Sequence, residues 1–511
     1  MYNKIHPYSA DASFDGGTLD CGNGLLLLIR KHIDPLQKGQ LLEIHSRELS
    51  VEEDLPAWCR LTKNELVSIV KNESELSFLV SKGPFEADKT IFQSAVINEI
   101  ENYQKKETVD KSGSEEKYTP QEIHPFSVMG IGSWPRPSWL IPLLHQHISG
   151  QLSLEDFNSA ANDAVRLCVQ DQEQASVDVF TDGEMRRDNY SSFVAGKLEN
   201  CQLIPLVDLL PLVDDPEKFQ KELDQLDVPA AEVRHPAVFG KIKRHHPLAL
   251  LEARFLRTIT KKPIKIALPG PYLLTRTMWM DCISDMAYGS REELACDIVK
   301  VLREELISLI DFGVEIVQFD EPVLTEVVFA AAKSGRTFMC GALGEKLPPE
   351  EELHFASGLL NKVCAGISPE RLGLHVCRGN WTRDETKALS GDYLSLIRYF
   401  NEVHVGTLFL EHATSRAGTL EFISSLPERF DLALGFVNQK KDNIENKDNI
   451  IREAEEVLKL MDGNSKRKLH LVPDCGFATF ADSPIAASKT AIAKLKVLHE
   501  VSLSLKLAKT S

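Results

Sequence analysis

The 511-residue sequence lacks the features of several large protein classes. Positive charge is scarce: 58 lysine and arginine residues face 75 aspartate and glutamate residues, whereas nucleic-acid binding needs a basic surface. No apolar run approaches the ~18–20 residues of a membrane span, and the first residues lack the apolar core of a signal peptide. The ten cysteines include no Cys-x-x-Cys pair, which is unlike a disulfide scaffold. These absences predict a cytoplasmic protein with no nucleic-acid or membrane partner.

A stretch with almost no apolar side chain divides the chain into two units. Residues 104–122 mix both charges with serine and glycine, and such a segment cannot bury enough surface to order itself. The chain is also longer than a typical single domain. We therefore expect a small N-terminal domain at 1–85, a helical and charged linker at 86–122, and a large domain at 123–511.

The small domain is expected to be an α+β two-layer sandwich. Its apolar runs and amphipathic segments follow in the order strand, helix, strand, helix, strand, strand. The expected elements are a strand at 18–22, a helix at 23–33, a strand at 39–46, a helix at 50–61, and hairpin strands at 65–70 and 75–81. Cys21 lies between the first strand and the first helix.

The large domain repeats an apolar run, a polar cluster and a helical segment. Near-continuous apolar runs are typical of parallel strands buried on both faces, and their number predicts a (β/α)8 barrel. The runs lie at 126–137, 177–188, 264–272, 314–324, 371–381, 402–412, 430–439 and 469–477, with a further candidate at 235–242. Nine candidates compete for eight places, so one of them is not a barrel strand. Residues 201–231 are expected to form a helical insertion.

Polar residues lie at or just after the carboxyl ends of these runs, where a barrel carries its active site. They are Ser133, Glu184, Asp320, His375, Cys377, Glu411 and Cys475. His375 and Cys377 are two residues apart, so on a strand they point to the same face. That spacing alone fits two core side chains as well as two metal ligands. The shared position at the barrel mouth favours the metal interpretation, because core residues have no reason to gather there.

Short motifs in this domain resemble those of the cobalamin-independent methionine synthase family, in its catalytic barrel, over about residues 123–498. The motifs are Ile-Gly-Ser at 131–133, Asp-Gly-Glu at 182–184, Pro-Gly-Pro at 269–271, Asp-Glu-Pro at 320–322, His-x-Cys at 375–377 and Pro-Asp-Cys-Gly at 473–476. Each motif is weak alone, but together, in this order and at these spacings, they are specific. The stretches HVCRGN and LFLEH look most like the shorter, single-barrel members.

The resemblance implies a Zn²⁺ site and an amino-acid site. The expected zinc ligands are His375, Cys377, Cys475 and Glu411, the first three forming the catalytic centre. Two thiolates, an imidazole and a carboxylate suit tetrahedral zinc. The residues expected to hold the amino-acid end of homocysteine are Ser133, Glu184 and Asp320.

Alternatives remain open at three positions of this site. His412 is a rival to Glu411 as the fourth ligand. Cys475 is otherwise a buried small hydrophobic residue, the commonest fate of a free cysteine. Arg186 or Arg187 either meets a substrate carboxylate or sulfonate, or the two form a solvated arginine pair.

The implied activity is zinc-dependent transfer of a methyl group to a thiol, most simply from a donor to homocysteine to give methionine. The second barrel with which long family members hold folate is missing here, so a folate, a methylated corrinoid on a partner protein and other methylated compounds all remain open as donors. The long members also have an aspartate and a histidine where this chain has Asn438-Gln439-Lys440-Lys441, which leaves the proton source open.

Three other functions compete with this one. The first is zinc-dependent alkyl transfer to coenzyme M or another thiol, although Ser133, Glu184 and Asp320 favour an amino-acid thiol over a sulfonate. The second is a non-catalytic sulfur-relay protein that uses Cys21. The third is a decarboxylase on the related uroporphyrinogen decarboxylase barrel, which is disfavoured because such enzymes do not need the zinc ligands.

Residues 14–84 resemble the TusA (SirA-like) family of small sulfur carriers. In that family the cysteine after the first strand carries a persulfide and precedes Pro-x-Pro, whereas here Cys21 precedes Gly-Asn-Gly. Glycine leaves backbone amides accessible at a helix N-terminus, where a thiolate is favoured. Cys21 is thus either a sulfur carrier served by a sulfur-transfer partner, or a half-buried residue of an inert docking module.

Overall fold

The structure is a computed structural model. It describes residues 6, 8–20, 24–71, 75–85, 117–148, 151–205, 217, 234–279, 287–333, 348–380, 382–386, 388–461, 467–480 and 485–510. Cys21, most of the expected linker at 86–122 and most of the expected insertion at 201–231 lie outside these residues. The chain forms two compact units that meet in sequence between Lys117 and Tyr118.

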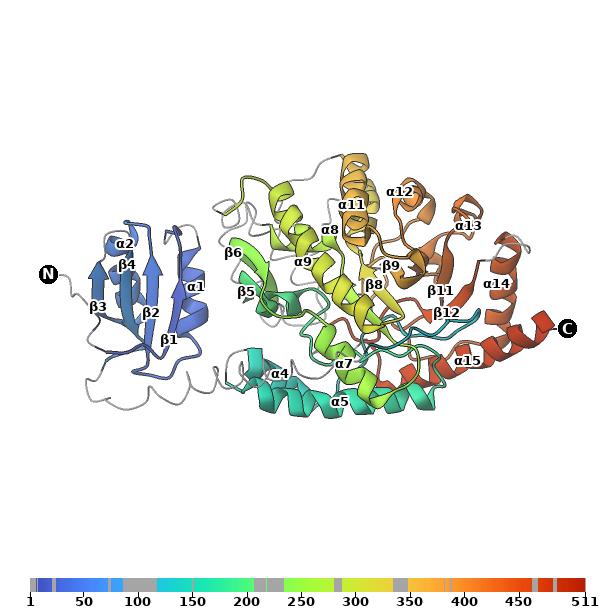
Figure 1. Cartoon of the computed structure of the whole chain (residues 1–511), viewed down its shortest axis with the longest axis horizontal. Coiled ribbons are helices and arrows are strands. Elements are labelled where there is room, and N and C mark those ends of the chain that lie inside the picture. The colour runs from blue at the N-terminus through green and yellow to red at the C-terminus, as the bar shows by residue number, and fades with distance from the viewer. Residues whose placement is uncertain are drawn as a thin grey trace. The chain divides into compact units, whose positions relative to one another are not determined.

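The N-terminal unit is a four-stranded sheet with two helices (Figure 1). Its elements are β1 (Ala12–Asp15), α1 (Leu25–Ile33), β2 (Leu41–Ser46), α2 (Val51–Thr62), β3 (Glu65–Lys71) and β4 (Leu76–Ser81). The strand order is β1-β2-β4-β3, in which only the β1–β2 pair is parallel. All of β4 is buried at the centre of the sheet, and α1 turns one apolar face inward because its leucines and isoleucines recur at helical spacing.

The first strand lies earlier than the sequence suggested. We expected it at 18–22, but residues 12–15 pair with β2, and the chain turns at Gly16 and Gly17 before the expected position. The turn is stabilised by the Asp15 carboxylate, which accepts a hydrogen bond from the Gly17 N–H at 2.7 Å. Gly17 has a φ of 61°, a conformation that glycine adopts without strain.

The C-terminal unit is built around a parallel sheet of six strands in the order β12-β11-β10-β9-β8-β7. The strands are β7 (Lys265–Pro269), β8 (Ile316–Asp320), β9 (Leu372–Val376), β10 (Thr407–Leu410), β11 (Asp431–Val437) and β12 (Leu469–Pro473). Two short extended segments join the outer strands through parallel bridges: Val128 pairs with Leu471, Met129 with Val179, and Phe180 with Ile264. The sheet with these two segments closes into a barrel, in the places where the sequence predicted eight parallel runs.

Much of the barrel interior is apolar. One core cluster takes residues from both bridging segments and from β8, β10, β11 and β12, among them Met129, Val179, Ile316 and Phe409. Nearly every strand residue is buried, as expected of strands covered by helices on the outside.

Helices follow the strands and cover the barrel from outside (Figure 1). They are α4 (Leu140–Ile148), α5 (Leu154–Gln174), α7 (Leu250–Ile259), α8 (Pro271–Met278), α9 (Arg291–Phe312), α10 (Val323–Lys333), α11 (Pro349–Cys364), α12 (Ile397–Glu402), α13 (Phe422–Ser425), α14 (Lys447–Leu460) and α15 (Ser488–Thr510). Short 3-10 helices lie at Ser192–Lys197, Pro369–Arg371, Tyr393–Leu396 and Ser415–Ala417. Ser153 directly precedes the long helix α5, and its hydroxyl accepts a hydrogen bond from the Asp156 N–H and so caps the helix.

The ninth candidate strand lies outside the barrel sheet. Residues 235–242 belong to β6 (Arg234–Arg244), which pairs antiparallel with β5 (Leu198–Pro205) in a separate two-stranded sheet. Residues 201–205, where the helical insertion was expected to begin, are therefore strand. Their backbone groups bond to β6, and this pairing decided the conformation against the local sequence preference.

The large unit also begins earlier than expected. Residues 118–122 were assigned to the linker, but the Tyr118 N–H donates to the Phe312 carbonyl at 3.1 Å and the Gln121 amide donates to the Lys261 carbonyl at 2.6 Å. The two rings of Tyr118 and Phe312 also pack edge to face, 5.3 Å apart.

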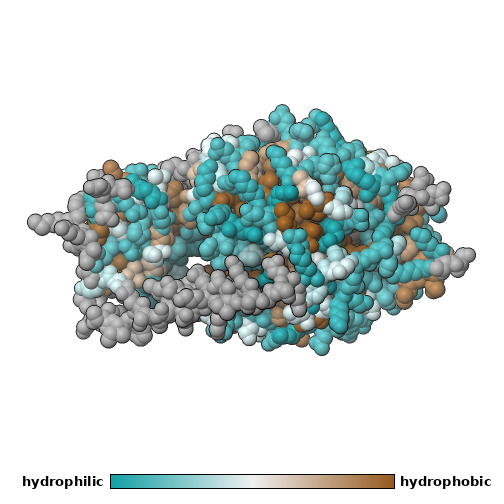
Figure 2. Space-filling view, viewed as in Figure 1, coloured by the Kyte–Doolittle hydropathy of each residue, from teal (hydrophilic) through white to brown (hydrophobic). Residues whose placement is uncertain are grey.

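Hydrophilic residues cover most of the face of the large unit that Figure 2 shows, with smaller hydrophobic areas between them. Within the described part of the chain, no helix is long and apolar enough to cross a membrane.

Candidate active site

A pocket opens at the carboxyl ends of the barrel strands. Six of the seven polar residues singled out in the sequence line it: Ser133, Glu184, Asp320, His375, Cys377 and Cys475. They come together because β8, β9 and β12 are parallel, so the ends of these strands meet at one mouth.

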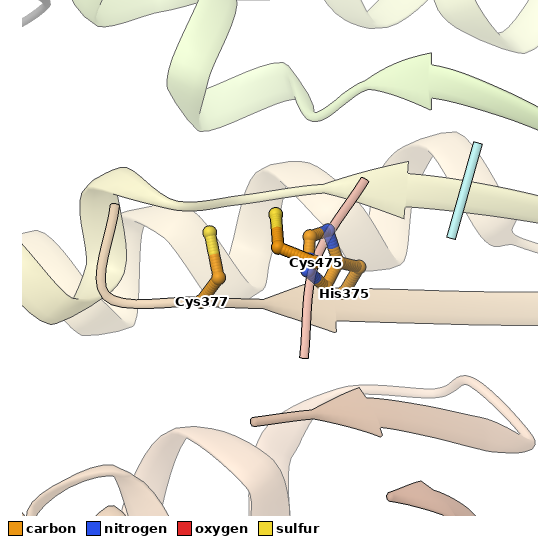
Figure 3. A group of neighbouring side chains, drawn as sticks. All are labelled: His375, Cys377 and Cys475. Carbon is orange, nitrogen blue, oxygen red and sulfur yellow. The ribbon is translucent and has the colours of Figure 1, made fainter. Parts of the chain in front are cut away.

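Three of the expected ligands form a compact group in this pocket (Figure 3). A ring nitrogen of His375 and the sulfur atoms of Cys377 and Cys475 all lie within 4.8 Å of one another, and all three residues are buried. His375 and Cys377 come from the end of β9 and Cys475 follows β12. This donor set of one imidazole and two thiols suits zinc.

A hydrogen bond with Asp320 fixes the orientation of the His375 ring. Its Nδ1 lies 3.0 Å from the Asp320 Oδ1, a hydrogen bond in which the ring nitrogen donates. Nε2 is buried and has no hydrogen-bond partner among the described residues. A buried imidazole nitrogen without a partner is costly, so a metal held at Nε2 would fit this site.

His375, Cys377 and Cys475 shift one another's pKa values. The hydrogen bond with Cys475 and the neighbouring His375 lower the pKa of Cys377 to about 5, against the effect of burial. Burial lowers the pKa of His375, but Cys377 and Asp320 outweigh it and raise that pKa to about 10. The pKa of Cys475 is raised, first by its bond to Cys377 and then by burial. Of the two thiols, Cys377 is therefore the one whose pKa is lowered.

Glu411, expected as the fourth ligand, lies outside this group and outside the pocket lining. Two guanidinium groups hold it: its Oε2 lies 3.3 Å from Arg378 and 3.5 Å from Arg416. Its Oε1 is buried and has no hydrogen-bond partner in the described structure. The rival His412 faces away from the pocket, with Nε2 3.9 Å from Glu453.

Tyr393 links Glu411 by hydrogen bonds to β9, the strand that carries His375. Its hydroxyl donates to the Val376 carbonyl at 2.7 Å and accepts from the Glu411 N–H at 3.0 Å. The guanidinium of Arg378 lies over the same ring, 3.9 Å from its centre. No sequence pattern pointed to Tyr393, because its role depends on a loop folding back.

Glu184 and Asp320 place two carboxyl groups in the pocket. Burial raises the pKa of Glu184 to about 7, although Arg187 opposes the shift. Glu184 adopts a φ of 56°, which is uncommon for a residue other than glycine and is often found at functional sites. Its carboxylate fills the space beside Gly132, where a Cβ atom would lie 2.2 Å from the Glu184 Oε1.

The arginines that we considered for a substrate anion do not line the pocket. Arg187 is buried in an ion pair with Glu252 at 2.6 Å, and it also donates to the Ala267 carbonyl. Arg186 donates to Asn162 and lies over the Phe255 ring. Arg187 is therefore no part of a solvated pair, because its charge serves the protein interior.

Residues 438–440, where the long family members differ, lie beside the pocket. The Gln439 amide donates to the Asn380 side chain at 2.6 Å, and Asn380 donates to the Gly476 carbonyl at 2.8 Å. Lys440 is buried and donates to the Gly379 carbonyl at 3.0 Å. These contacts fix the loop after β9 against the loop that carries Cys475.

Sequence reasoning missed three polar residues of the lining: Tyr190, Asn380 and Thr479. Asn380 lies in the HVCRGN stretch, three residues after Cys377, and this proximity could have indicated it. Tyr190 and Thr479 follow strand ends at a distance, in irregular segments that carry no periodic signal.

A barrel whose successive strand ends bring polar residues into one pocket defines an α/β-barrel enzyme. A family model described as "Cobalamin-independent synthase, Catalytic domain" matches residues 126–205 and 222–346. The methionine synthase of Saccharolobus solfataricus is 25% identical over 347 residues, which span 68% of this chain and 86% of that protein. The methionine synthase of Thermococcus kodakarensis is 26% identical over 347 residues, or 68% and 85% of the two chains.

Solved structures share this fold. A B12-independent methionine synthase from Shewanella sp. W3-18-1, in complex with selenomethionine, has a TM-score of 0.57 and 22% identity, over 76% of this chain and 99% of that one. A putative vitamin-B12 independent methionine synthase from Listeria monocytogenes has a TM-score of 0.52 and 17% identity, over 75% and 99%. The sequence matches make the barrel similar to the cobalamin-independent methionine synthase catalytic domain, and the chain is an enzyme of the methyltransferase class. The solved structures show the fold.

Proposed function

We propose that this chain is a zinc-dependent, cytoplasmic methyltransferase that transfers a methyl group to the thiol of homocysteine and so forms methionine. The observation that carries the proposal is the convergence of His375, Cys377 and Cys475 on the pocket that Glu184 and Asp320 also line. A thiol acceptor and an amino-acid recognition site would then share one cavity.

His375, Cys377 and Cys475 would hold the zinc, and Glu411 is proposed as its fourth ligand. A bound zinc deprotonates a thiol and presents the thiolate as a nucleophile at neutral pH. The proposal for Glu411 is supported by its Oε1, which is buried and has no hydrogen-bond partner among the described residues. Arg378 and Arg416 keep that carboxylate close to the strand end that carries Cys377.

The acceptor is proposed to be an amino acid because of the charge of the pocket. Among the described lining residues, Glu184 and Asp320 are carboxylic acids and none is lysine or arginine. Carboxylates stabilise an ammonium group and repel a sulfonate. The relatives named methionine synthase agree with homocysteine and disfavour coenzyme M as the acceptor. A methylated folate and a methylated corrinoid protein are the two donor classes to test.

The N-terminal unit is proposed as a sulfur-carrier-like module of the TusA type, which a sulfur-transfer partner would load. Support comes from its order of strands and helices and from the position of Cys21 in the sequence. Cys21 lies outside the described residues, so its role rests on the sequence alone.

The test combines metal analysis with product detection. Purified protein should contain about one zinc per chain and form methionine from homocysteine with one of the two donors. Cys475→Ser should lose the zinc, whereas Cys364→Ser, a matched change of another buried cysteine in α11, should keep it. Stoichiometric zinc in the Cys475→Ser protein would remove Cys475 from the ligand set. Absence of methyl transfer by the zinc-loaded protein with every donor would refute the function.

A further inference from the structure

A chain of buried polar side chains runs beneath the pocket and ends at His375. The Lys265 ammonium donates to the Gln318 Oε1 and, at 2.6 Å, to the Ile131 carbonyl. The Gln318 Nε2 donates to the Asp320 Oδ1 at 2.7 Å. The same Asp320 oxygen accepts the bond from the His375 Nδ1 at 3.0 Å. Neighbouring strands β7, β8 and β9 therefore contribute one continuous series of hydrogen bonds.

The direction of the series is set at both of its ends. Lys265 donates to the Gln318 oxygen, and the Asp320 carboxylate can only accept, so the Gln318 NH2 group must face Asp320. Without Lys265, the Gln318 oxygen would lose its donor and the amide would be held by Asp320 alone. The Asp320 carboxylate would then receive its hydrogen bond from a less restrained partner.

Asp320 in turn decides which nitrogen of His375 keeps its proton when the ring gives one up to bind a metal. A carboxylate next to Nδ1 keeps that nitrogen protonated, and Nε2 is then the nitrogen that can bind a metal. The Asp320 Oδ1 receives hydrogen bonds from Gln318 and His375 together, which restrict its position more than one bond would.

Burying the Lys265 ammonium group at this place is energetically unfavourable if the residue serves only to fill the core. Its side chain is 1% exposed, and no carboxylate lies within ion-pair distance among the described residues. Burial lowers its pKa to about 7, although the nearby Asp320 and Glu184 oppose the shift. The ring of Phe409, whose centre lies 4.4 Å from the ammonium, gives partial compensation. An apolar side chain would satisfy the core at lower cost.

We propose that Lys265 and Gln318 are positioning residues that hold Asp320 against the His375 Nδ1 and thereby keep Nε2 available to a metal ion. The inference rests on the proposed zinc site and adds two residues that do not touch it. It assigns a role to a buried lysine that the methyl transfer itself does not need.

The main experiment measures zinc affinity of the metal-depleted, full-length protein by competition with a chromophoric chelator. Lys265→Met and Gln318→Met keep the approximate side-chain volume and should bind zinc more weakly, by at most the roughly 10–100-fold that is typical when the direct partner of a metal-bound histidine is removed. Gln318→Glu should also weaken binding, because it keeps an acceptor for Lys265 but replaces the donor to Asp320 with a carboxyl group.

A matched control separates this role from loss of a buried lysine in general. Lys494 in α15 is fully buried and bound to Glu445, and it is absent from the pocket lining. Lys494→Met should lower the thermal midpoint and leave zinc affinity unchanged. A purely structural role of Lys265 predicts the same result for Lys265→Met, so unchanged zinc affinity in Lys265→Met and Gln318→Met would overturn the proposal.

A second measurement does not depend on zinc. In protein labelled with ¹⁵N-histidine, the proton on the His375 Nδ1 should give a downfield resonance that disappears in His375→Gln. It should shift or exchange faster in Gln318→Met and Lys265→Met, and remain unchanged in Lys494→Met. A wild-type protein with this pattern but no zinc binding would refute the zinc function and keep the positioning role. An identical resonance in the wild type, Gln318→Met, Lys265→Met and Lys494→Met would refute the positioning role.

Discussion

Gly132→Ala offers a direct test of the amino-acid site, because it would move one carboxylate and little else. The new Cβ would lie 2.2 Å from the Glu184 Oε1 and 3.5 Å from the Ala267 Cβ, so only the carboxylate is in its way. The end of a glutamate side chain can rotate, so the cost to folding is small. The carboxylate must leave the place where it faces the pocket.

The expected loss follows from the interaction that is broken. A charge-assisted hydrogen bond between a carboxylate and an ammonium group contributes about 1.5–3 kcal/mol. Its loss should weaken homocysteine binding roughly 10–150-fold, since about 1.4 kcal/mol corresponds to a factor of ten. Zinc content should stay as in the wild type, because Gly132 is distant in sequence from the ligands and Glu184 is not among the three clustered residues.

The assay is titration calorimetry of the zinc-loaded protein with homocysteine. Gly130→Ala is the matched control, because a Cβ at Gly130 meets nothing within 4 Å. Both changes restrict the unfolded chain in the same way, so stability effects cancel in the comparison. In a Glu184→Ala background, Gly132→Ala should have almost no further effect. Equal homocysteine affinity of the two glycine variants would show that Glu184 does not hold the ammonium group.

Three further outcomes are expected. Binding of methionine, which has no thiol to titrate, should strengthen as the pH rises from 6 to 8, with a midpoint near 7. The reason is that the raised pKa of Glu184 leaves its carboxyl group neutral at lower pH. Isothermal titration should find that this pH dependence is abolished in Glu184→Gln. Asp320→Asn should weaken both homocysteine and zinc binding, each by roughly tenfold or more, because Asp320 lines the pocket and also holds His375; unchanged zinc affinity would separate the two roles. Cys21→Ser should retain methyl transfer within about twofold in a steady-state assay with free homocysteine, because the pocket residues all lie between 131 and 479; loss of activity with zinc still bound would place Cys21 in the catalytic cycle.

The site was largely predictable because parallel strands impose their own geometry. Once Asp320, His375 and Cys475 are recognised at the ends of buried strands, the barrel brings them together whatever the intervening loops do. The pair His375 and Cys377 follows from the two-residue period of a strand. These predictions needed only strand direction and strand ends, which apolar runs indicate well.

The errors arose where tertiary contacts outweighed local patterns. Residues 201–205 are a strand because β6 pairs with them, and the first strand lies at Ala12–Asp15 because two glycines end it. The sequence predicted Glu411 at the end of a strand, where it lies, but its arginine partners were unpredictable for a similar reason. Arg378 is near it only through the barrel, and Arg416 only through the loop after β10. Hydrogen-bond partners of this kind depend on how the loops fold, and the periodicity of apolar residues in the sequence does not indicate loop conformation.

Asp320 would belong to both halves of the proposed site, the zinc ligands and the amino-acid pocket, and this shared position has a physical consequence. Its Oδ1 accepts from Gln318 and His375, and the residue lines the same pocket as Glu184. An ammonium group bound by this carboxylate would draw negative charge away from the His375 N–H. Acceptor binding and the hold on the histidine would then be thermodynamically coupled, and such coupling acts equally in both directions. Lys265 and Gln318 stabilise Asp320 from the opposite side, so the carboxylate keeps its place when either partner is absent. A single buried carboxylate would in this way serve both the proposed metal ligand His375 and the proposed acceptor without moving between them.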